Sequence, residues 1–397
     1  MTDFTKTRAM FDLPEGMIYL NGNSLGPMPK GAPDRIADFM HNEWATELIR
    51  GWNTKGWFMQ TNTLGDRIGR LLGAEPDSIV VGDTLSIRIF QAVAACLALR
   101  PDRRVILSDT GNFPTDLYMV EGLMKLRDAG YRLDTPAPEE VLDRITEETA
   151  CVMLTEVDYR TGRKHDMARL TARAHEAGAL SIWDLAHTAG AIPCDVAGGG
   201  ADFAVGCTYK FLNGGPGAPA FIYVAPRHAD RALPALSGWL GHDAPFAFER
   251  SYRPGAGIER MRVGTPPILQ MAALDAALDA WDDVDISDLD AARVRLSERF
   301  IAEVEARCEG VTLATPRDPA ARGSQVSFRH AQGYAVMQAL IARGVIGDFR
   351  APDILRFGIT PLYQSEEDMV RAAEVLADIL ATRDWDRPEF HARAAVT

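Results

Sequence analysis

Short apolar runs alternate with helix-like segments between residues 51 and 265, and this alternation restricts the fold more than any other feature. The segment 166–178 is typical of the helices, since its apolar residues recur at helical spacing and Gly178 ends it. Strands that are separated by helices predict a mainly parallel sheet with helices on both faces. The strand-like runs stand at 104–108, 151–155, 179–183, 203–207 and 220–224.

The rest of the chain predicts an arm and a second, smaller domain. We expect residues 1–50 to form an N-terminal arm that packs with the small domain, and residues 51–265 to form the large domain. Residues 266–397 then provide a linking helix at about 266–282 and a small α/β domain. In that domain we expect strands near 311–314 and 325–328 and helices near 332–343 and 365–382.

The arm carries the turn N-G-N-S-L-G at residues 21–26. Its small residues suit a close approach to a binding site. Asn23 and Ser24 are candidates for substrate contact, and turn formation explains the same two residues equally well.

Lysine is rare in this chain, and one lysine stands in an unusual place. Lys210 is the only lysine after residue 164, in a chain with 42 lysines and arginines together. It lies in the uncharged run G-C-T-Y-K-F-L-N-G-G-P-G, where a surface charge has no evident role. A lysine amine can lose its proton and form a Schiff base, which a guanidinium cannot do. The alternative is a surface lysine beside a glycine turn.

A carboxylate is predicted to lie near this amine. The run A-L-S-I-W-D-L-A-H reads as a buried strand that ends at Asp184, and the run 201–208 leads to Lys210. Ligands of an open parallel sheet bind at the carboxyl ends of its strands. A Schiff-base lysine with an acidic partner for the ring nitrogen is the arrangement that holds pyridoxal phosphate (PLP). Asp184 could instead cap a helix that follows the strand.

A phosphate site is predicted where the segment 78–99 changes from strand to helix. Free N–H groups and the hydroxyl of Ser86 at the helix start suit a phosphate. Asp83, Thr84 and Ser86 are also ordinary helix caps. The chain has no G-x-G-x-x-G or Walker-type loop, which argues against dinucleotide or ATP chemistry.

Six motifs, in order along nearly the whole chain, together resemble kynureninase of the bacterial type. The resemblance implies the aspartate-aminotransferase fold of PLP enzymes (fold type I), with a mainly parallel seven-stranded sheet and a small C-terminal α/β domain. It also implies hydrolysis of L-kynurenine to anthranilate and L-alanine, in tryptophan degradation or on the way to NAD. The motifs are Y-L-N-G-N-S-L-G-P (19–27), N-F-P-T-D (112–116), W-D-L-A-H (183–187), C-T-Y-K-F-L-N-G-G-P-G (207–217), S-G-W-L-G-H (237–242) and R-F-G-I-T-P-L-Y (356–363).

The resemblance implies a role for each matching residue. Lys210 would be the Schiff-base lysine and Asp184 the partner of the pyridinium nitrogen, with Tyr209 as proton shuttle or phosphate ligand. Phe113 would stack on the cofactor ring. The remaining cofactor contacts within the subunit would be Leu85, Ser86, Asp116, Thr155 and His187.

Three further residues would complete the site. Trp239 and Thr265 would reach the phosphate of a second subunit, which implies an obligate homodimer with shared active sites. Arg356 would hold the α-carboxylate of the substrate, because a bidentate guanidinium suits that group. Trp52 would shape the aryl pocket, or would simply pack in the core.

Three residues depart from the expected pattern beside these motifs. Arg88 replaces an expected asparagine, and Glu156 and Asp158 stand where less acidic residues are expected. They either tune the site or face solvent. The choice between kynurenine and 3-hydroxykynurenine stays open, although Trp52 and Thr265 favour kynurenine.

Composition excludes several classes of partner. A net charge of −13 without a basic patch argues against nucleic acid and against anionic membranes. No apolar signal segment starts the chain, and no apolar run approaches the ~20 residues that span a bilayer. Scattered cysteines without C-x-x-C spacing indicate reduced thiols in a cytoplasm and no zinc site. They are Cys96, Cys151, Cys194, Cys207 and Cys308.

Three rival functions share some of these features. A cysteine desulfurase needs a nucleophilic cysteine well after the lysine, and the only candidate is Cys308 at an apparent helix end. A plain aminotransferase would need a keto acid as amino acceptor. A non-catalytic ligand sensor would bind kynurenine without releasing product.

Overall fold

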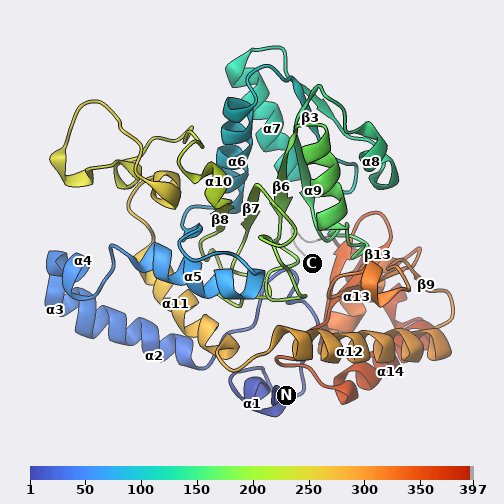
Figure 1. Ribbon diagram of the computed structural model, residues 1–397. Coiled ribbons are helices and arrows are strands. Elements are labelled where there is room, and N and C mark those ends of the chain that lie inside the picture. Colours follow the sequence, from blue (N-terminus) through green and yellow to red (C-terminus); the bar gives the residue numbers. More distant parts are fainter. Residues whose placement is uncertain (394–397) are drawn as a thin grey trace.

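A seven-stranded sheet forms the centre of the computed structural model, which describes residues 1–393 (Figure 1). Its strand order is β2-β8-β7-β6-β5-β3-β4, and every neighbouring pair is parallel except the two pairs that include β8. The predicted mainly parallel sheet is therefore confirmed. The strands are β2 (Ile79–Val81), β3 (Val105–Leu107), β4 (Arg132–Asp134), β5 (Thr149–Thr155), β6 (Leu180–Asp184), β7 (Phe203–Gly206) and β8 (Phe221–Val224).

Helices cover both faces of this sheet because successive side chains of each strand point to opposite sides. Leu154 and Trp183 enter one core, and their neighbours Met153 and Ile182 enter the other. Strand β5 is buried at every position, as expected for a strand covered on both faces. The first core packs under α5 (Gln60–Leu72), α9 (Met167–Glu176) and α11 (Ile268–Leu278), and the second under α6 (Leu85–Leu99) and α7 (Pro114–Arg127).

A smaller unit follows α11 and contains a four-stranded antiparallel sheet of order β12-β13-β10-β9. The predicted strands and helices of this unit are present, whereas the hairpin of β12 and β13 was not predicted. Its register places Asp348 directly opposite Arg356. The elements are β9 (Thr312–Leu313), β10 (Gln325–Arg329), β12 (Asp348–Arg350) and β13 (Ile354–Gly358), with α12 (Ile286–Arg307), α13 (Gly333–Ala342) and α14 (Glu366–Thr382).

The N-terminal arm contacts both units. Strand β1 (Ile18–Tyr19) pairs in parallel with β11 (Val345–Ile346) of the small unit. A few residues later the N–H of Gly26 donates to the carbonyl of Tyr209 at 2.8 Å. A Cβ at Gly26 would lie 2.3 Å from the carbonyl oxygen of Lys210, so only glycine allows this approach. The domain boundaries at residues 50 and 265 stay a prediction.

Short helices complete the described part of the chain, and none of the helices in residues 1–393 is long and apolar enough to cross a membrane. The short helices are α1 (Phe4–Ala9), α2 (Gly31–Asp38), α3 (Ala45–Glu47), α4 (Gly51–Thr54), α8 (Val141–Arg144), α10 (Pro226–Ala229) and α15 (Pro388–His391).

Candidate active site

A cavity of about 180 Å³ lies at the carboxyl ends of the central strands, where the arm and the small unit meet the large sheet. Ala186 and Arg350 line it beside residues that the sequence singled out. The cavity therefore gathers groups from distant parts of the chain at the expected edge of the sheet. The predicted residues that line it are Asn23, Ser24, Leu85, Phe113, Thr155, Asp184, His187, Tyr209, Lys210 and Arg356.

One buried carboxyl group, that of Asp184, lines this cavity, and a second, that of Asp116, lies close to it. Asp184 ends β6, and its Oδ1 accepts a hydrogen bond from the N–H of Ala186 at 2.8 Å. Burial raises the pKa of Asp184, against the opposing effect of Lys210. Burial and the charge of Asp184 together raise the pKa of Asp116 well above its usual range. Such a pair stabilises a cation placed against it.

The amine of Lys210 lies close to His187. The distance between Lys210 Nζ and His187 Nε2 is 3.1 Å, and the same ring nitrogen lies 3.1 Å from the carbonyl oxygen of Asn23. Burial and the charge of Lys210 hold the pKa of His187 well below its usual range, so its imidazole is neutral. The amine of Lys210 is thus held by a neutral ring at the wall of the cavity, where it can reach a carbonyl carbon and form a Schiff base.

Tyr209 brings a phenol to the same cavity. Its pKa is raised above the usual range, first by the neighbouring Cys207 and then by burial. The phenol therefore stays protonated at neutral pH and can donate a proton or a hydrogen bond.

The N-terminus of α6 borders the cavity through Leu85. Thr84 is the N-cap, and its side chain makes no capping hydrogen bond. The N–H groups of the first turn have no partner within the helix, and the helix dipole adds positive potential there. These groups suit an anion such as phosphate.

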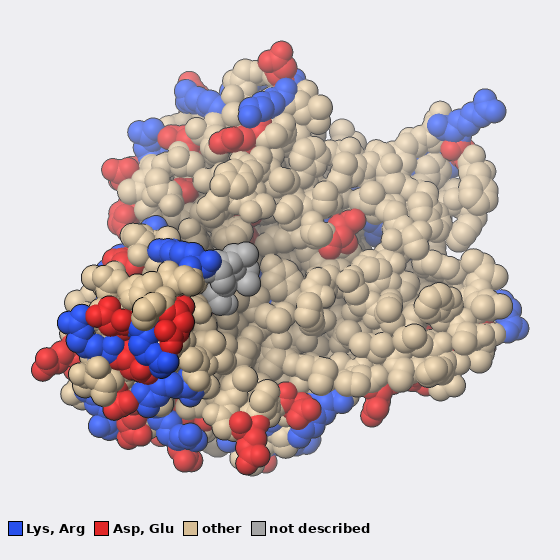
Figure 2. All heavy atoms as spheres, turned by 180° about the vertical axis from the view of Figure 1, so that it is seen from behind, with Lys and Arg blue, Asp and Glu red and all other residues tan. Residues whose placement is uncertain are grey.

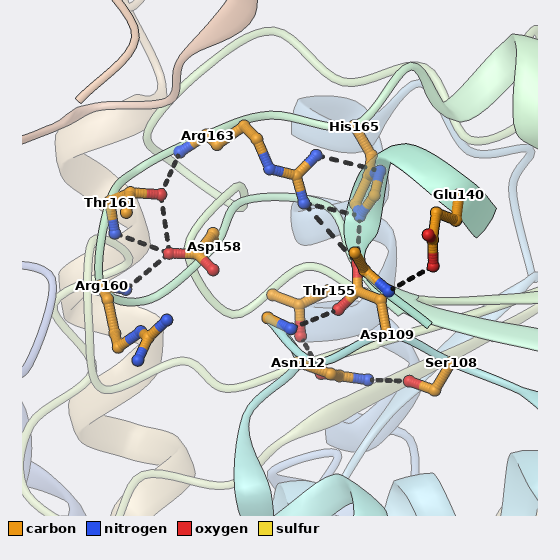
Figure 3. Close-up of polar contacts among 12 residues, drawn as sticks. Ser108, Asp109, Asn112, Glu140, Thr155, Asp158, Arg160, Thr161, Arg163 and His165 are labelled. Carbon is orange, nitrogen blue, oxygen red and sulfur yellow. Dashed lines mark hydrogen bonds and ion pairs between the residues drawn. The ribbon is translucent and has the colours of Figure 1, made fainter. Parts of the chain in front are cut away.

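A polar network fixes the loop that carries Phe113 (Figure 3). Asn112 Nδ2 donates to Ser108 Oγ at 2.9 Å, and Asn112 Oδ1 accepts from the N–H of Phe113 at 2.7 Å. The hydroxyl of Thr155 also donates to Asn112 Oδ1 and lies 3.4 Å from Asp184 Oδ2. The network ties the aromatic ring of Phe113 to the carboxylate at the end of β6.

The hairpin 157–164 supports this loop from the other side. The ring of Tyr159 packs edge-on against Phe113, with 5.2 Å between ring centroids. At the base of the hairpin His165 Nε2 lies 2.7 Å from Asp109 Oδ2, a contact drawn in Figure 3. The sequence reasoning missed Tyr159, because its neighbours in the fold come from elsewhere in the chain.

The small unit contributes two charged side chains to the lining of the cavity, Arg350 and Arg356. Arg356 pairs with Asp348, with Nε donating to Oδ1 at 2.6 Å. Its Nη1 donates to the carbonyl of Tyr159 at 2.6 Å and its Nη2 to Ser24 Oγ at 2.7 Å. Arg350, which the sequence reasoning also missed, lies on the same cavity wall. The pattern D-x-R shortly before Arg356 could have indicated Arg350, because residues two positions apart in a strand, such as Asp348 and Arg350, lie on the same face.

Five predicted site residues do not line this cavity. Ser86 lies in the first turn of α6, and Asp116 lies behind Asp184. Trp52 packs on the core, with its ring centroid 6.0 Å from that of Trp57. Trp239 is 39% exposed, and Thr265 borders a separate small cavity.

The three departures from the expected pattern are all buried, so the interpretation that they face solvent is wrong. Arg88 is 1% exposed and donates to the carbonyls of Gly82 and Met261 at 3.0 and 2.7 Å, which ties α6 to the segment before Thr265. Asp158 accepts N–H bonds within the hairpin 157–164. Burial raises the pKa of Glu156 to about 7.

None of the five cysteines lines the cavity. Cys308 caps the end of α12 and is buried in the core of the small unit, so it is not placed as a mobile nucleophile. All five cysteines are free. Within residues 1–393 no cluster of His, Cys, Asp and Glu is arranged to hold a metal ion.

The residues present fit PLP. Asp116 Oδ2 and His187 Nδ1 are buried without a hydrogen-bond partner, as expected of atoms that await a ligand. The carboxyl pair suits the protonated ring nitrogen, Lys210 the aldehyde carbon, and the start of α6 the phosphate. Phe113 lines the cavity and is 39% exposed, which leaves its face free for a ring.

Comparisons with solved structures agree with this fold. A cysteine desulfurase from Thermococcus onnurineus NA1 superposes with a TM-score of 0.81 at 17% identity, covering 96% of this chain and 99% of that chain. A C-DES variant with glycine covalently linked to its PLP cofactor gives a TM-score of 0.78 at 17% identity, covering 95% of this chain and all of that chain (100%). At such identities the likeness establishes the fold.

Comparisons of sequence establish the family. The kynureninase of Burkholderia mallei is 50% identical over 98% of this chain and 95% of its own length, and that of Pseudomonas fluorescens is 48% identical over the same shares. A family model for the kynureninase C-terminal domain matches residues 289–376. The chain therefore belongs to the kynureninase family of PLP-dependent enzymes.

Proposed function

We propose that this protein hydrolyses the Cβ–Cγ bond of L-kynurenine and releases anthranilate and L-alanine. The observation that carries the proposal is the cavity between the large sheet and the small unit. It holds an amine, a carboxylate and a guanidinium, from Lys210, Asp184 and Arg356. The choice of L-kynurenine as the substrate rests on the similarity to kynureninases over 98% of the chain.

Asp184, Lys210 and Tyr209 each have a different role in the proposed reaction. Bound PLP supplies an electron sink that stabilises negative charge at the substrate Cα. Asp184 would keep the ring nitrogen of bound PLP protonated, and the free amine of Lys210 would remove the proton from Cα. Tyr209 would give its phenolic proton to Cβ, the carbon that keeps the electron pair of the broken bond and becomes the methyl group of alanine. A water molecule adds to the γ-carbonyl before the carbon–carbon bond breaks.

The substrate must be oriented for these steps. Arg356 would hold the α-carboxylate, with Ser24 and Asn23 of the arm beside it. Phe113 would stack on the cofactor ring and exclude water from that face. Leu85 and Ser86 would bind the phosphate through the start of α6, with Thr155, His187 and Asp116 around the ring.

The protein would act as a homodimer with shared active sites. Large apolar side chains are exposed on two segments that lie on the same side of the molecule (Figure 1). Figure 2 shows a broad stretch of surface with few charged side chains, which suits a subunit interface. In such a dimer Trp239 and Thr265 would reach the partner's phosphate. The exposed residues include Trp44, Leu48 and Ile49 on one segment and Trp239, Phe246 and Phe248 on the other.

Mixing two inactive variants tests this arrangement. Lys210→Ala lacks the amine, and Trp239→Ala lacks the proposed contact to the partner. If sites are shared, each mixed dimer contains one complete site, and activity returns when the two proteins are mixed and reassembled. Activity that stays at the level of the separate variants would contradict shared sites.

The finer substrate choice belongs to the same proposal. We expect L-kynurenine to be preferred over 3-hydroxykynurenine, with a role in cytoplasmic tryptophan degradation or in supply of a precursor of NAD. The free cysteines support a reducing compartment.

Steady-state kinetics on both kynurenines tests the reaction. Anthranilate fluorescence should rise with an equal amount of alanine, in the absence of any keto acid. Turnover that requires a keto acid would indicate an aminotransferase. Binding without product would indicate a ligand sensor, and sulfide release from cysteine a desulfurase.

A further inference from the structure

The guanidinium of Arg356 is already engaged by the protein on all three nitrogens. Nε and Nη2 face Asp348 as a fork, Nη1 donates to the carbonyl of Tyr159, and Nη2 also contacts Ser24 Oγ. Its side chain is only 2% exposed. A substrate carboxylate would therefore meet a cation whose hydrogen-bonding capacity is mostly used.

The charge of Arg356 is also balanced. Asp348 is 1% exposed, and the pKa of its carboxyl lies below the usual range, an effect of Arg356 and Arg350 that outweighs its burial. Asp348 therefore carries a full negative charge beside Arg356. Arg356 and Asp348 alone form a neutral pair, which attracts a distant carboxylate weakly. The positive charge that remains at this wall of the cavity belongs to Arg350.

Arg350 lies where it can meet a ligand. It ends β12, two residues after Asp348, and lines the same cavity as Lys210 and Arg356. Its Nη2 lies 3.0 Å from Asp348 Oδ2 and 3.4 Å from Ser24 Oγ, and its Nη1 donates to the carbonyl of Phe349 at 3.2 Å, which leaves Nε and one N–H of Nη1 without a partner in residues 1–393. Its side chain is 33% exposed, against 2% for Arg356, so it keeps donors that can turn toward the cavity.

We propose that Arg350 binds the α-carboxylate of the substrate directly and supplies the net positive charge that attracts it, while Arg356 and Asp348 form the rigid support. This inference rests on the proposed function and names a further substrate-binding residue of that same site. Arg356 keeps its contact to the substrate through the one N–H of Nη1 that Asp348, Tyr159 and Ser24 leave free. Removing the guanidinium of Arg350 then takes away the main contact to the α-carboxylate, and removing that of Arg356 takes away the support of the site.

Two substitutions separate charge from shape. In the PLP-loaded enzyme, Arg350→Gln should raise KM for L-kynurenine about 10- to 100-fold, the usual loss for a hydrogen bond to a charged group, with kcat changed much less. Arg350→Lys should recover part of this loss, because it keeps the charge and loses the fork. Arg329→Gln is the matched control, since Arg329 forms an exposed ion pair with Asp353 in the same small sheet.

A second ligand shows whether the carboxylate is the group recognised. The amine that L-kynurenine would become on losing its carboxyl group can be titrated against the change in cofactor absorbance. Its affinity should be the same, within about twofold, for the wild-type protein and Arg350→Gln. The same substitution should weaken the binding of L-kynurenine, which carries the carboxylate.

Other outcomes overturn the inference. An unchanged KM in Arg350→Gln would exclude direct binding. An equal loss of affinity for the amine would mean that Arg350 only supports the fold of the site, as would a lower melting temperature with kcat and KM falling together. If the wild-type protein binds both ligands but releases no anthranilate, the proposed function fails. The affinities of the two ligands for the wild-type protein and for Arg350→Gln still test whether Arg350 binds the carboxylate.

Discussion

Asp184 and Asp202 are buried carboxylates at opposite ends of neighbouring strands, and their surroundings differ completely. Asp202 precedes β7 and accepts hydrogen bonds from Ser181, His175, Arg227 and His228 at 2.7–3.1 Å. These partners lower its pKa below the usual range although burial opposes them. Asp184 ends β6 with few donors and a second carboxyl beside it, and its pKa is raised.

The contrast separates a structural carboxylate from one that is held ready for a ligand. At the amino ends of the strands, every lone pair of Asp202 is used within the protein. At the carboxyl ends, neither Asp184 nor Asp116 forms an ion pair at contact distance within the described residues, the charge of Lys210 only partly offsets their burial, and Asp116 Oδ2 has no hydrogen-bond partner there. A buried carboxylate without enough hydrogen bonds or a nearby cation destabilises the folded protein. The protonated ring nitrogen of PLP would supply that cation to Asp184 and Asp116.

The largest effect is expected from Asp184→Asn. Because the amide cannot keep the ring nitrogen protonated, kcat for L-kynurenine should fall on the order of 10²- to 10³-fold, a typical loss for one electrostatic contact in an active site. The cofactor-free variant should unfold at the same temperature as the wild-type protein or higher, since the substitution removes a poorly solvated charge. Undiminished kcat would show that Asp184 does not face the cofactor.

The reverse pattern is expected for Asp202→Asn. His228 and Arg227 would lose their shared acceptor, so the free energy of unfolding should fall by about 2–3 kcal/mol. The value of kcat per folded molecule should stay within about twofold of wild type, because the change lies at the far end of the sheet. Denaturant unfolding followed beside the kinetics checks both statements, and a selective loss of kcat would break the comparison.

The two carboxylates should also respond oppositely to pH in the cofactor-free protein. A folded pKa below the unfolded value means that Asp202 adds stability above about pH 4, which is lost as the pH falls. Because the folded pKa of Asp184 is raised, the protonated form of this residue is the more stable one in the folded protein. Its contribution to the free energy of unfolding therefore decreases as the pH rises. From pH 3 to 7, Asp202→Asn should become less stable relative to wild type and Asp184→Asn more stable. Parallel curves would contradict the assigned directions.

The large sheet and the Lys210–Asp184 pair could be predicted because each feature follows from local sequence. A buried apolar run ends at Asp184 and another leads to Lys210, so parallel strands alone bring them to one edge. The hairpin of β12 and β13 could not be predicted, because its strands are short and its register depends on pairing within the small unit. Asp348 and Arg350 were missed with it.

Burial was the least predictable property of the site. The sequence left open whether Arg88 tunes the site or faces solvent. Its side chain is buried and donates to the carbonyl of Met261, which lies 173 positions away in the sequence. Trp52 could be assigned to a pocket only by resemblance, since its ring packs against Trp57 and does not line the cavity around Lys210. Long-range contacts of this kind leave no periodic signal in the sequence.

The smallest effect is expected from Cys308→Ala. This thiol is buried in the core of the small unit, so its removal should cost about 1 kcal/mol of stability and leave the turnover of L-kynurenine within about twofold of wild type. Measured turnover and melting temperature check this together. Loss of activity without unfolding would revive a cysteine-based reaction.

The covalent attachment of PLP to Lys210 is the claim on which the rest depends. Reducing the PLP-loaded enzyme with borohydride fixes a Schiff base as a stable secondary amine, and mass spectrometry of the peptides then locates it. The pyridoxyl group should be found on the peptide that contains Lys210. Its presence on another lysine, or its absence from all six lysines in a protein that still cleaves L-kynurenine, would contradict the account.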